Sequence, residues 1–192
     1  AHQYVDRLRD RRIITMITIL DTTLRDGEQT SGVSFASEEK LSLARLLLED
    51  LCVDRVEVAS ALVSDGEFST VKKIARWANS KGLLNKVEVL GFVDGDKSVD
   101  WIRSAGINVM NLLCKGSLKH CAMQLGKKPE EHIADIKNTL KYAEEAGITV
   151  NVYLEDWSNG MKNSPEYVFA LVDALRDTKI RRFMLPDTLG IL

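Results

Sequence analysis

A regular alternation between short β-branched runs and longer amphipathic segments is the feature that most constrains how this chain can fold. The runs lie at 16–20, 55–59, 86–90, 107–113, 148–154 and 181–185. The segments between them carry apolar residues at helical spacing; in the first, Leu41, Ala44 and Leu48 fall on one face. Because strands that alternate with helices pair in parallel through right-handed crossovers, the pattern predicts an α/β fold.

Residues at the ends of the amphipathic segments predict where helices begin and end. Ser37 is a good N-cap for the first helix. Pro129 opens a later helix that ends at Gly147, because proline suits the first helical position and glycine the residue after the last. Ser164 and Pro165 start another helix. These boundaries fit between the predicted strands.

Two α/β layouts compete, an open doubly wound sheet and a (β/α)₈ TIM barrel. No GxGxxG motif follows the first run, which disfavours the dinucleotide-binding form of the open sheet. The first run is followed instead by a polar, charged loop, LDTTLRDGEQTSG, at residues 20–32. Since catalytic residues of a TIM barrel gather in the loops after its strands, a barrel is the better prediction.

Composition limits the class of protein. The chain has 26 Lys and Arg against 28 Asp and Glu, a net charge of −2, which gives no support to nucleic-acid binding. Cys52, Cys114 and Cys121 form no CxxC pair, so we expect no disulfide framework and no structural zinc, and a cytoplasmic location. The apolar run at 13–20 is far shorter than the ~20 residues that span a bilayer, so no membrane contact is expected.

The loop after the first run holds the strongest candidates for chemistry. Asp21, Arg25, Asp26, Glu28 and Gln29 lie within nine positions. Carboxylate oxygens suit hard divalent cations, and a permanently charged guanidinium suits a developing enolate. A solvated loop in which an Asp caps a turn fits this spacing equally well. The residue types alone leave both interpretations open.

The full string DTTLRDGEQTSGVSF resembles the signature of the DRE-TIM metallolyase superfamily, which includes isopropylmalate, homocitrate and citramalate synthases. The resemblance implies that Asp26 is a metal ligand and that Arg25 stabilises the enolate oxygen. The third signature residue matches Glu57, in DRVEVAS. A carboxylate in such an apolar run is costly unless it is paired, and Arg25 or its neighbours are the expected partners. The alternative is a surface glutamate on a half-exposed strand.

Later strand ends carry more of the same resemblance. They are GFVDG at 91–95, NLLCKGSLKHCAMQLGKKPEE at 111–131, NVYLEDWSNG at 151–160 and LPDTLG at 185–190. Among members of the superfamily, these strings look most similar to the pyruvate-using citramalate synthases. The resemblance therefore covers nearly all of the chain after residue 15.

The resemblance also implies which residues contact the substrates. Leu90, Leu113 and Tyr153 would surround the alkyl group of a 2-oxo acid, although Leu113 could equally belong to the barrel core. Thr188 would donate to the substrate carboxylate, or could cap a following helix. Glu155 would help to activate the acetyl group of acetyl-CoA, as base, binding group or relay, with a solvated carboxylate as the alternative.

The three histidines provide no obvious ligand set. His2 lies near the N-terminus, and His132 is predicted on a charged helix face. His120 is predicted in a loop, or near the mouth of the site in contact with the coenzyme. No HxH occurs, so the two histidine ligands of the family are expected beyond Leu192.

Length completes the prediction, because a TIM barrel typically needs ~250 residues and this chain has 192. We expect an N-terminal extension at 1–14 and, at 15–192, the N-terminal portion of a catalytic barrel that stops after about six strands. Two open strand edges would then be exposed.

The parent enzyme is expected to be a homodimeric acyltransferase that condenses acetyl-CoA with pyruvate to citramalate, in isoleucine-type branched-chain biosynthesis. The resemblance implies a divalent metal, Mg, Mn or Zn. Alternatives are an isopropylmalate synthase that uses 2-oxoisovalerate in leucine biosynthesis, a hydroxymethylglutaryl-CoA lyase, and a catalytically incomplete fragment.

Overall fold

The structure, a computed structural model, describes residues 17–192 and contains one parallel sheet of six strands in the order β1-β2-β3-β4-β5-β6. The predicted extension at 1–14 lies outside the described residues. The strands are β1 (Leu20–Asp21), β2 (Arg55–Ser60), β3 (Val87–Phe92), β4 (Val109–Lys115), β5 (Thr149–Glu155) and β6 (Ile180–Met184). This half-barrel confirms the predicted α/β class and the partial TIM barrel.

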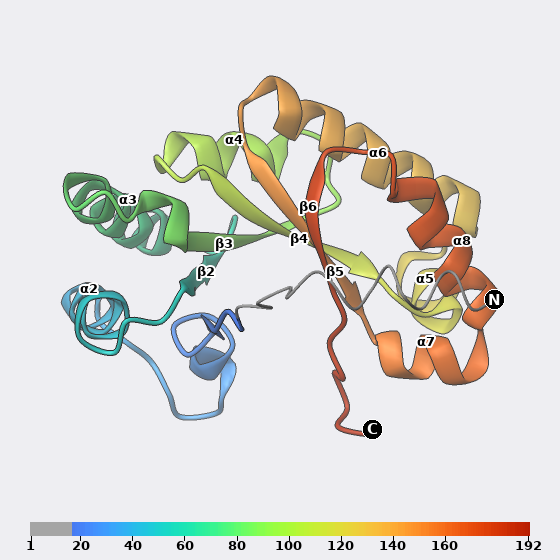
Figure 1. Ribbon diagram of the computed structural model, residues 1–192, viewed down its shortest axis with the longest axis horizontal. Coiled ribbons are helices and arrows are strands. Elements are labelled where there is room, and N and C mark those ends of the chain that lie inside the picture. The colour runs from blue at the N-terminus through green and yellow to red at the C-terminus, as the bar shows by residue number, and fades with distance from the viewer. Residues whose placement is uncertain (1–16) are drawn as a thin grey trace, which may run out of the picture.

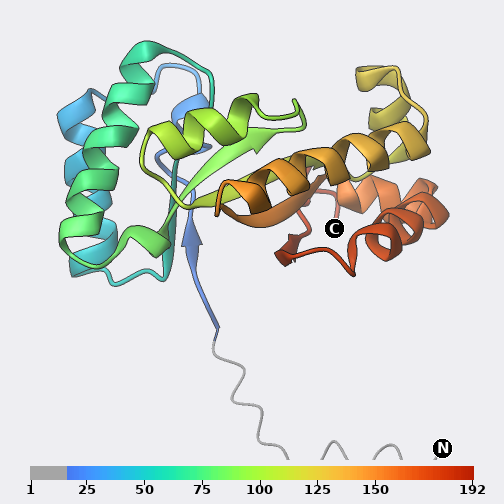
Figure 2. The same ribbon diagram turned by 90° about the horizontal axis from the view of Figure 1, so that it is seen from above.

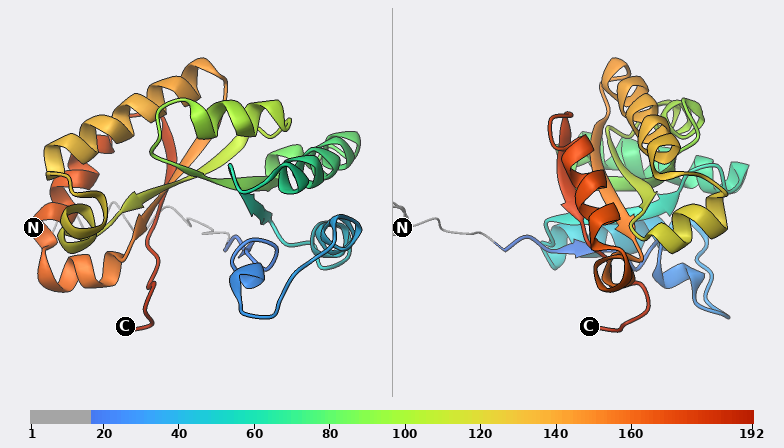
Figure 3. Two further views of the ribbon diagram at one scale, coloured as in Figure 1. Left: turned by 180° about the vertical axis from the view of Figure 1, so that it is seen from behind. Right: turned by 90° about the vertical axis from the view of Figure 1, so that its right-hand side faces the viewer.

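Helices follow the outer side of the curved sheet in an arc (Figure 1). They are α2 (Ser37–Arg45), α3 (Asp65–Ser80), α4 (Lys97–Ser104), α5 (Leu118–Leu125), α6 (Pro129–Glu145), α7 (Trp157–Asn163) and α8 (Pro165–Leu175). Figures 1 and 2 agree in placing α2 and α3 at one end of the sheet and α5, α7 and α8 at the other. Figure 3 shows the segment after β6 extending away from α4 and α6. No helix within residues 17–192 is long and apolar enough to cross a membrane.

The predicted helix starts are correct at Pro129 and Pro165, which are the first residues of α6 and α8. The predicted N-cap Ser37 is wrong, because Ser37 is itself the first helical residue and Ala36 precedes it as N-cap. The Glu39 carboxylate accepts the Ala36 N–H at 2.7 Å. A side chain inside the helix thus satisfies the amide donor at its start, and no capping hydroxyl is required.

The core lies between the outer face of the strands and the helices. Outward strand residues such as Val56, Val89 and Leu112 are fully buried against helical residues such as Ile74 and Ile102. Each buried aliphatic side chain of this size contributes about 1.5–3 kcal/mol. The apolar positions at helical spacing therefore dock the helices, and residues at alternate strand positions face the interior of the half-barrel.

The interior face is polar at mid-height. Glu57 of β2, Asn111 of β4 and Asn151 of β5 are fully buried there. Asn111 lies opposite Asn151 in the β4–β5 register, and Asn151 lies opposite Arg182 of β6. These side chains form a row across the barrel interior just below the carboxyl ends of the strands.

Candidate active site

A cavity of about 530 Å³ opens at the carboxyl ends of the strands. Seven of the eight predicted site residues line it, and the eighth, Glu57, contacts one of them. The lining residues are Thr22, Arg25, Asp26, Gln29, Ser60, Leu90, Phe92, Leu113, Tyr153, Glu155, Pro186, Asp187 and Thr188. Residues at or just after the ends of all six strands thus meet at the end of the barrel where TIM-barrel enzymes bind their substrates.

Arg25 is held by a tight turn after β1, in which the Thr22 carbonyl accepts the N–H groups of Arg25 and Asp26 at 3.1 and 2.7 Å. The Arg25 Nε donates to the Glu57 carboxylate. Its Nη1 donates to Asp26 Oδ1 at 2.8 Å. The Arg25 side chain is 14% exposed and Glu57 is 0% exposed, whereas Asp26 is 62% exposed. The buried Glu57 therefore fixes the guanidinium from the barrel interior, and the cavity leaves the guanidinium accessible.

Electrostatics around this pair favours a permanent cation at Arg25. Burial disfavours the charge, but the nearby Glu57 and Asp26 carboxylates outweigh it and raise the pKa of Arg25. Burial raises the pKa of Glu57, while Arg25 and Asn111 act in the opposite direction. Burial, and next the Glu57 charge, raise the pKa of Tyr153 to about 12, so this residue is a neutral phenol. The cavity thus offers a fixed positive charge beside a hydroxyl.

Two asparagines that the sequence analysis missed support Glu57. Asn111 Nδ2 donates to Glu57 Oε1 at 2.6 Å, and Asn151 Nδ2 donates to Asn111 Oδ1 at 2.8 Å. Arg182 donates to Asn151 Oδ1 at 3.4 Å. The sequence marks both asparagines, because Asn111 in NVMNLL and Asn151 in TVNVYL are polar residues in the middle of apolar strands. Such a residue in a buried strand requires a hydrogen-bonding partner.

Neighbouring strands form an apolar wall of the cavity. Leu90 is 4% exposed, and Leu113 lies opposite Tyr153 in the β4–β5 register. Leu113 is partly accessible and lines the cavity, rather than lying wholly in the core. Phe92 extends the same wall and was not predicted; it lies opposite Leu113 in the β3–β4 register.

The Thr188 hydroxyl is oriented by a backbone group. The Asp156 N–H donates to Thr188 Oγ1 at 3.0 Å, so the hydroxyl proton of Thr188 is available to another acceptor. Asp156 has φ 64°, in the left-handed region, and its carboxylate accepts from Ser117 and Asn159 at 2.7 and 2.8 Å. Thr188 lies four residues before the last residue of this sequence, and the structure places no helix between them.

Glu155 ends β5 and is not a solvated loop carboxylate. It forms an ion pair with Lys115 at the end of β4, and the two residues are register partners. Lys115 was not predicted. Its signal is again alternation, because Asn111, Leu113 and Lys115 occupy every second position of one strand.

Two of the three histidines differ from the prediction. His120 lies on α5 and not in a loop, with its Nε2 3.4 Å from Asp156 Oδ2. His132 is only 1% exposed on α6, not on a charged face, and its Nε2 accepts the Lys115 N–H at 3.1 Å. Burial, and next the charge of Lys127, lower the pKa of His132 to about 4. It is therefore neutral near pH 7.

Metal binding requires more ligands than the described part of the chain brings together. Within residues 17–192 no group of three or more His, Cys, Asp and Glu side chains is placed to hold an ion. Asp26 faces the cavity and offers one carboxylate, already bonded to Arg25. Asp26 alone does not fit a complete metal centre.

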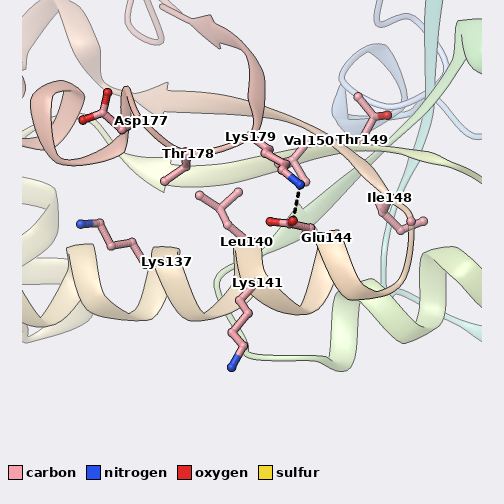
Figure 4. A pocket seen from close by; sticks show the side chains of 11 residues that line it. Lys137, Leu140, Lys141, Glu144, Ile148, Thr149, Val150, Asp177, Thr178 and Lys179 are labelled. Atoms are coloured by element: carbon pink, nitrogen blue, oxygen red, sulfur yellow. Dashed lines mark hydrogen bonds and ion pairs between the residues drawn. The ribbon is translucent and has the colours of Figure 1, made fainter.

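A second hollow, of about 450 Å³, lies at the opposite end of the strands, between α6 and the start of β6. Figure 4 shows its charged side chains, with Glu144 and Lys179 paired at 2.5 Å and Lys141 directed away. None of the predicted site residues lines it. The amino ends of barrel strands commonly serve stability, so the candidate active site is the cavity at the carboxyl ends.

Known proteins match this chain along nearly its whole length. A 2-isopropylmalate synthase from Saccharolobus solfataricus is 31% identical over 191 residues, 99% of this chain and 46% of that protein. A probable 2-isopropylmalate synthase from Ignicoccus hospitalis is 34% identical over 92% of this chain and 42% of its own length. A putative (R)-citramalate synthase from Methanopyrus kandleri is 32% identical over 92% of this chain and 33% of its own length. The chain thus spans between a third and just under half of these curated relatives.

Solved structures show the same fold. The hydroxymethylglutaryl-CoA lyase of Bacillus subtilis matches with a TM-score of 0.66 and 22% identity over 92% of this chain and 59% of that chain. The lyase of Brucella melitensis matches with a TM-score of 0.66 and 19% identity over 92% and 62%. The family model described as HMGL-like matches residues 16–192. On that match and on these relatives, the chain belongs to the HMGL-like family.

Proposed function

We propose that the whole protein condenses acetyl-CoA with a short 2-oxo acid and then hydrolyses the thioester. The observation that carries this proposal is that a carboxylate-bound guanidinium, a second carboxylate and an apolar wall face one cavity at the carboxyl ends of the strands. The relatives named isopropylmalate synthase and citramalate synthase support the same reaction class.

The steps that lead to the new C–C bond have candidate groups in this cavity. The acetyl methyl group loses a proton to Glu155, directly or through water, and the enolate carbon forms the new C–C bond with the keto carbon. The keto oxygen takes up the electron pair, and Arg25 stabilises the negative charge that develops on oxygen during these steps. Water then adds to the thioester carbonyl, and the CoA thiolate leaves. Arg25 suits this role because Glu57 fixes its orientation before any substrate binds.

Thr188 and Asp26 are assigned to binding. The Thr188 hydroxyl, whose oxygen already accepts the Asp156 N–H, donates to the substrate carboxylate. A divalent metal such as Mg, Mn or Zn would polarise the keto group, with Asp26 as one ligand and the other ligands outside the described residues.

Pyruvate is the preferred 2-oxo acid in this proposal, and 2-oxoisovalerate is the second candidate. Leu90, Leu113, Tyr153 and Phe92 line the cavity. In this proposal they lie beside the keto group and leave room for a methyl substituent. A methylene group changes discrimination by only about 1–3 kcal/mol, so the wall sets a preference and not an absolute rule.

The test is to measure CoA release by the whole protein with acetyl-CoA and each 2-oxo acid, with Mg or Mn added. We expect turnover with pyruvate and weaker turnover with 2-oxoisovalerate. Arg25→Ala should lower kcat by about 10²–10³-fold, the loss typical of one oxyanion donor, and Arg25→Lys should recover part of it. Absence of CoA release with every 2-oxo acid, or normal turnover of Arg25→Ala, would contradict the proposal.

A further inference from the structure

The ends of β4 and β5 are joined by an ion pair of which the reaction described above uses Glu155 but not Lys115. Lys115 and Glu155 are register partners, and the Lys115 ammonium contacts the Glu155 carboxylate. Their side chains are 16% and 24% exposed. In the part of the chain that the structure describes, Lys115 is the only cation within ion-pair distance of Glu155.

Lys115 is held from two helices. His132 of α6 accepts its backbone N–H at 3.1 Å, and the Tyr167 hydroxyl of α8 donates to its backbone carbonyl at 2.8 Å. Both side chains are buried. Side chains of the outer helices thus take over both backbone hydrogen bonds of the last residue of β4. This fixes the direction in which the lysine side chain leaves the strand.

The following glycine keeps the two strand ends close. The Gly116 N–H donates to the Glu155 carbonyl at 2.6 Å. A Cβ at residue 116 would lie 2.5 Å from the Leu154 carbonyl oxygen. A side chain at this position would therefore force β4 and β5 apart, together with the Lys115–Glu155 pair.

Other charged groups of the cavity are engaged elsewhere. Arg25 is bonded to Glu57 and Asp26. Lys115 itself does not line the cavity, whereas Glu155 does. Glu155 thus faces the cavity, and Lys115 is anchored behind it. In such an ion pair the anchored lysine can fix the orientation of the carboxylate.

We propose that Lys115 is a positioning residue that holds the Glu155 carboxylate at the cavity wall, where it acts on the acetyl methyl group. This inference rests on the proposed function for the role of Glu155. Lys115 acts through Glu155, so its removal should slow the chemical step without weakening the binding of the 2-oxo acid.

The first experiment compares kcat and KM of the whole protein in four forms: unchanged, Lys115→Met, Glu155→Gln and the double variant. We expect Lys115→Met to lower kcat about tenfold or more with KM for the 2-oxo acid within about twofold, and to have little further effect in Glu155→Gln. Lys115→Arg should recover most of the activity because it keeps the charge. Lys141→Met, an exposed lysine beside the second hollow, is the matched control and should leave both constants unchanged.

Two results would overturn the inference. One is a kcat for Lys115→Met within twofold of the unchanged protein. The other is an equal fall in both backgrounds, since independent effects multiply when two residues do not act together.

A second experiment separates failure of this inference from failure of the proposed function. If the whole protein condenses no 2-oxo acid, the same four forms are compared by urea unfolding. If the pair is coupled, the effect of the double variant on the unfolding equilibrium constant should differ from the product of the two single effects by about threefold or more. Additivity within that factor would show that Lys115 does not hold Glu155, whatever the reaction is.

Discussion

Replacing His132 by glutamine should remove most of one acid-dependent loss of stability. His132 is buried, and its Nε2 accepts the Lys115 N–H. Only the neutral imidazole can accept at this nitrogen, so the other nitrogen carries the proton. That Nδ1 has no hydrogen-bond partner among the described residues. A second proton therefore has no place in the folded site without breaking the bond to Lys115.

The magnitude follows from the pKa. Burial, and next the charge of Lys127, lower the pKa of His132 from 6.5 to about 4, which corresponds to at most about 3 kcal/mol. Between these two values the unfolded chain binds a proton that the folded chain does not bind. The free energy of unfolding should therefore fall as the pH falls through this window, and the contribution is complete above pH 6.5.

The assay is urea unfolding, followed by tryptophan fluorescence and circular dichroism, at intervals from about pH 7 to about pH 4. Glutamine offers an acceptor oxygen to the Lys115 N–H but does not titrate, so the difference between His132→Gln and the unchanged protein isolates the histidine. We expect this difference to move by up to about 3 kcal/mol in favour of the variant on acidification. His132→Leu should cost about 1–3 kcal/mol even at neutral pH, because it leaves the Lys115 N–H unpaired.

Parallel pH curves for His132→Gln and the unchanged protein would refute this reasoning. The histidine would then be solvated or protonated in the folded state. The support that α6 gives to Lys115 would also be lost, and with it one of the contacts that place the Lys115 side chain.

Three further changes test the site and its frame. Glu57→Gln should lower the free energy of unfolding by up to about 3 kcal/mol in a urea titration, since it removes the buried carboxylate that pairs with Arg25 and leaves only the exposed Asp26; an unchanged midpoint would contradict the pairing. Gly116→Ala should cost about 1–3 kcal/mol in the same titration because its methyl group would meet the Leu154 carbonyl, and equal stability would show that the strand ends can separate freely. Thr188→Val should raise KM for the 2-oxo acid about tenfold in the CoA-release assay with little loss of folding stability, and an unchanged KM would remove Thr188 from the binding site.

The fold could be predicted from the sequence because alternating strands and helices permit few arrangements. The prediction of the first strand is the least accurate of the six. The run at 16–20 predicts a strand, but within the described residues only Leu20 and Asp21 pair with β2. Ile17 and Ile19 are 89% and 58% exposed. Within the described residues β1 lies at an edge of the sheet and pairs with β2 alone, so apolar character did not lead to burial there.

Helical spacing is a better guide to the position of His132 than the charge of its neighbours in the sequence. His132, Ile136 and Leu140 are spaced by four residues, which places them on one face of α6, and all three are buried. Helical spacing therefore puts His132 in the core. The charged neighbours in the sequence suggested a polar face, but they lie elsewhere around the helix.

The polar interior could not be predicted in the same way. Both faces of a barrel strand are buried, so the sequence of β4 alternates between two buried environments and not between core and solvent. Leu112 and Cys114 are fully buried against the helices. The local pattern shows that Asn111 is a polar residue in an apolar strand, but it does not say which residues bond to it, because these lie on other strands.

Strand β4 shows that register, more than any single side chain, determines whether this site exists. Three alternate residues serve it at three heights: Asn111 supports Glu57, Leu113 lines the cavity and Lys115 binds Glu155. A slip of one residue would turn all three toward the helices and bring the outward-facing residues of β4 into the barrel. The hydrogen bonds of Lys115 to two outer helices oppose that slip at the last residue of the strand. Contacts on the outer face of β4 thus fix the register of the residues on its inner face. For this reason we expect a substitution of His132, which does not line the cavity, to disturb the active site through Lys115.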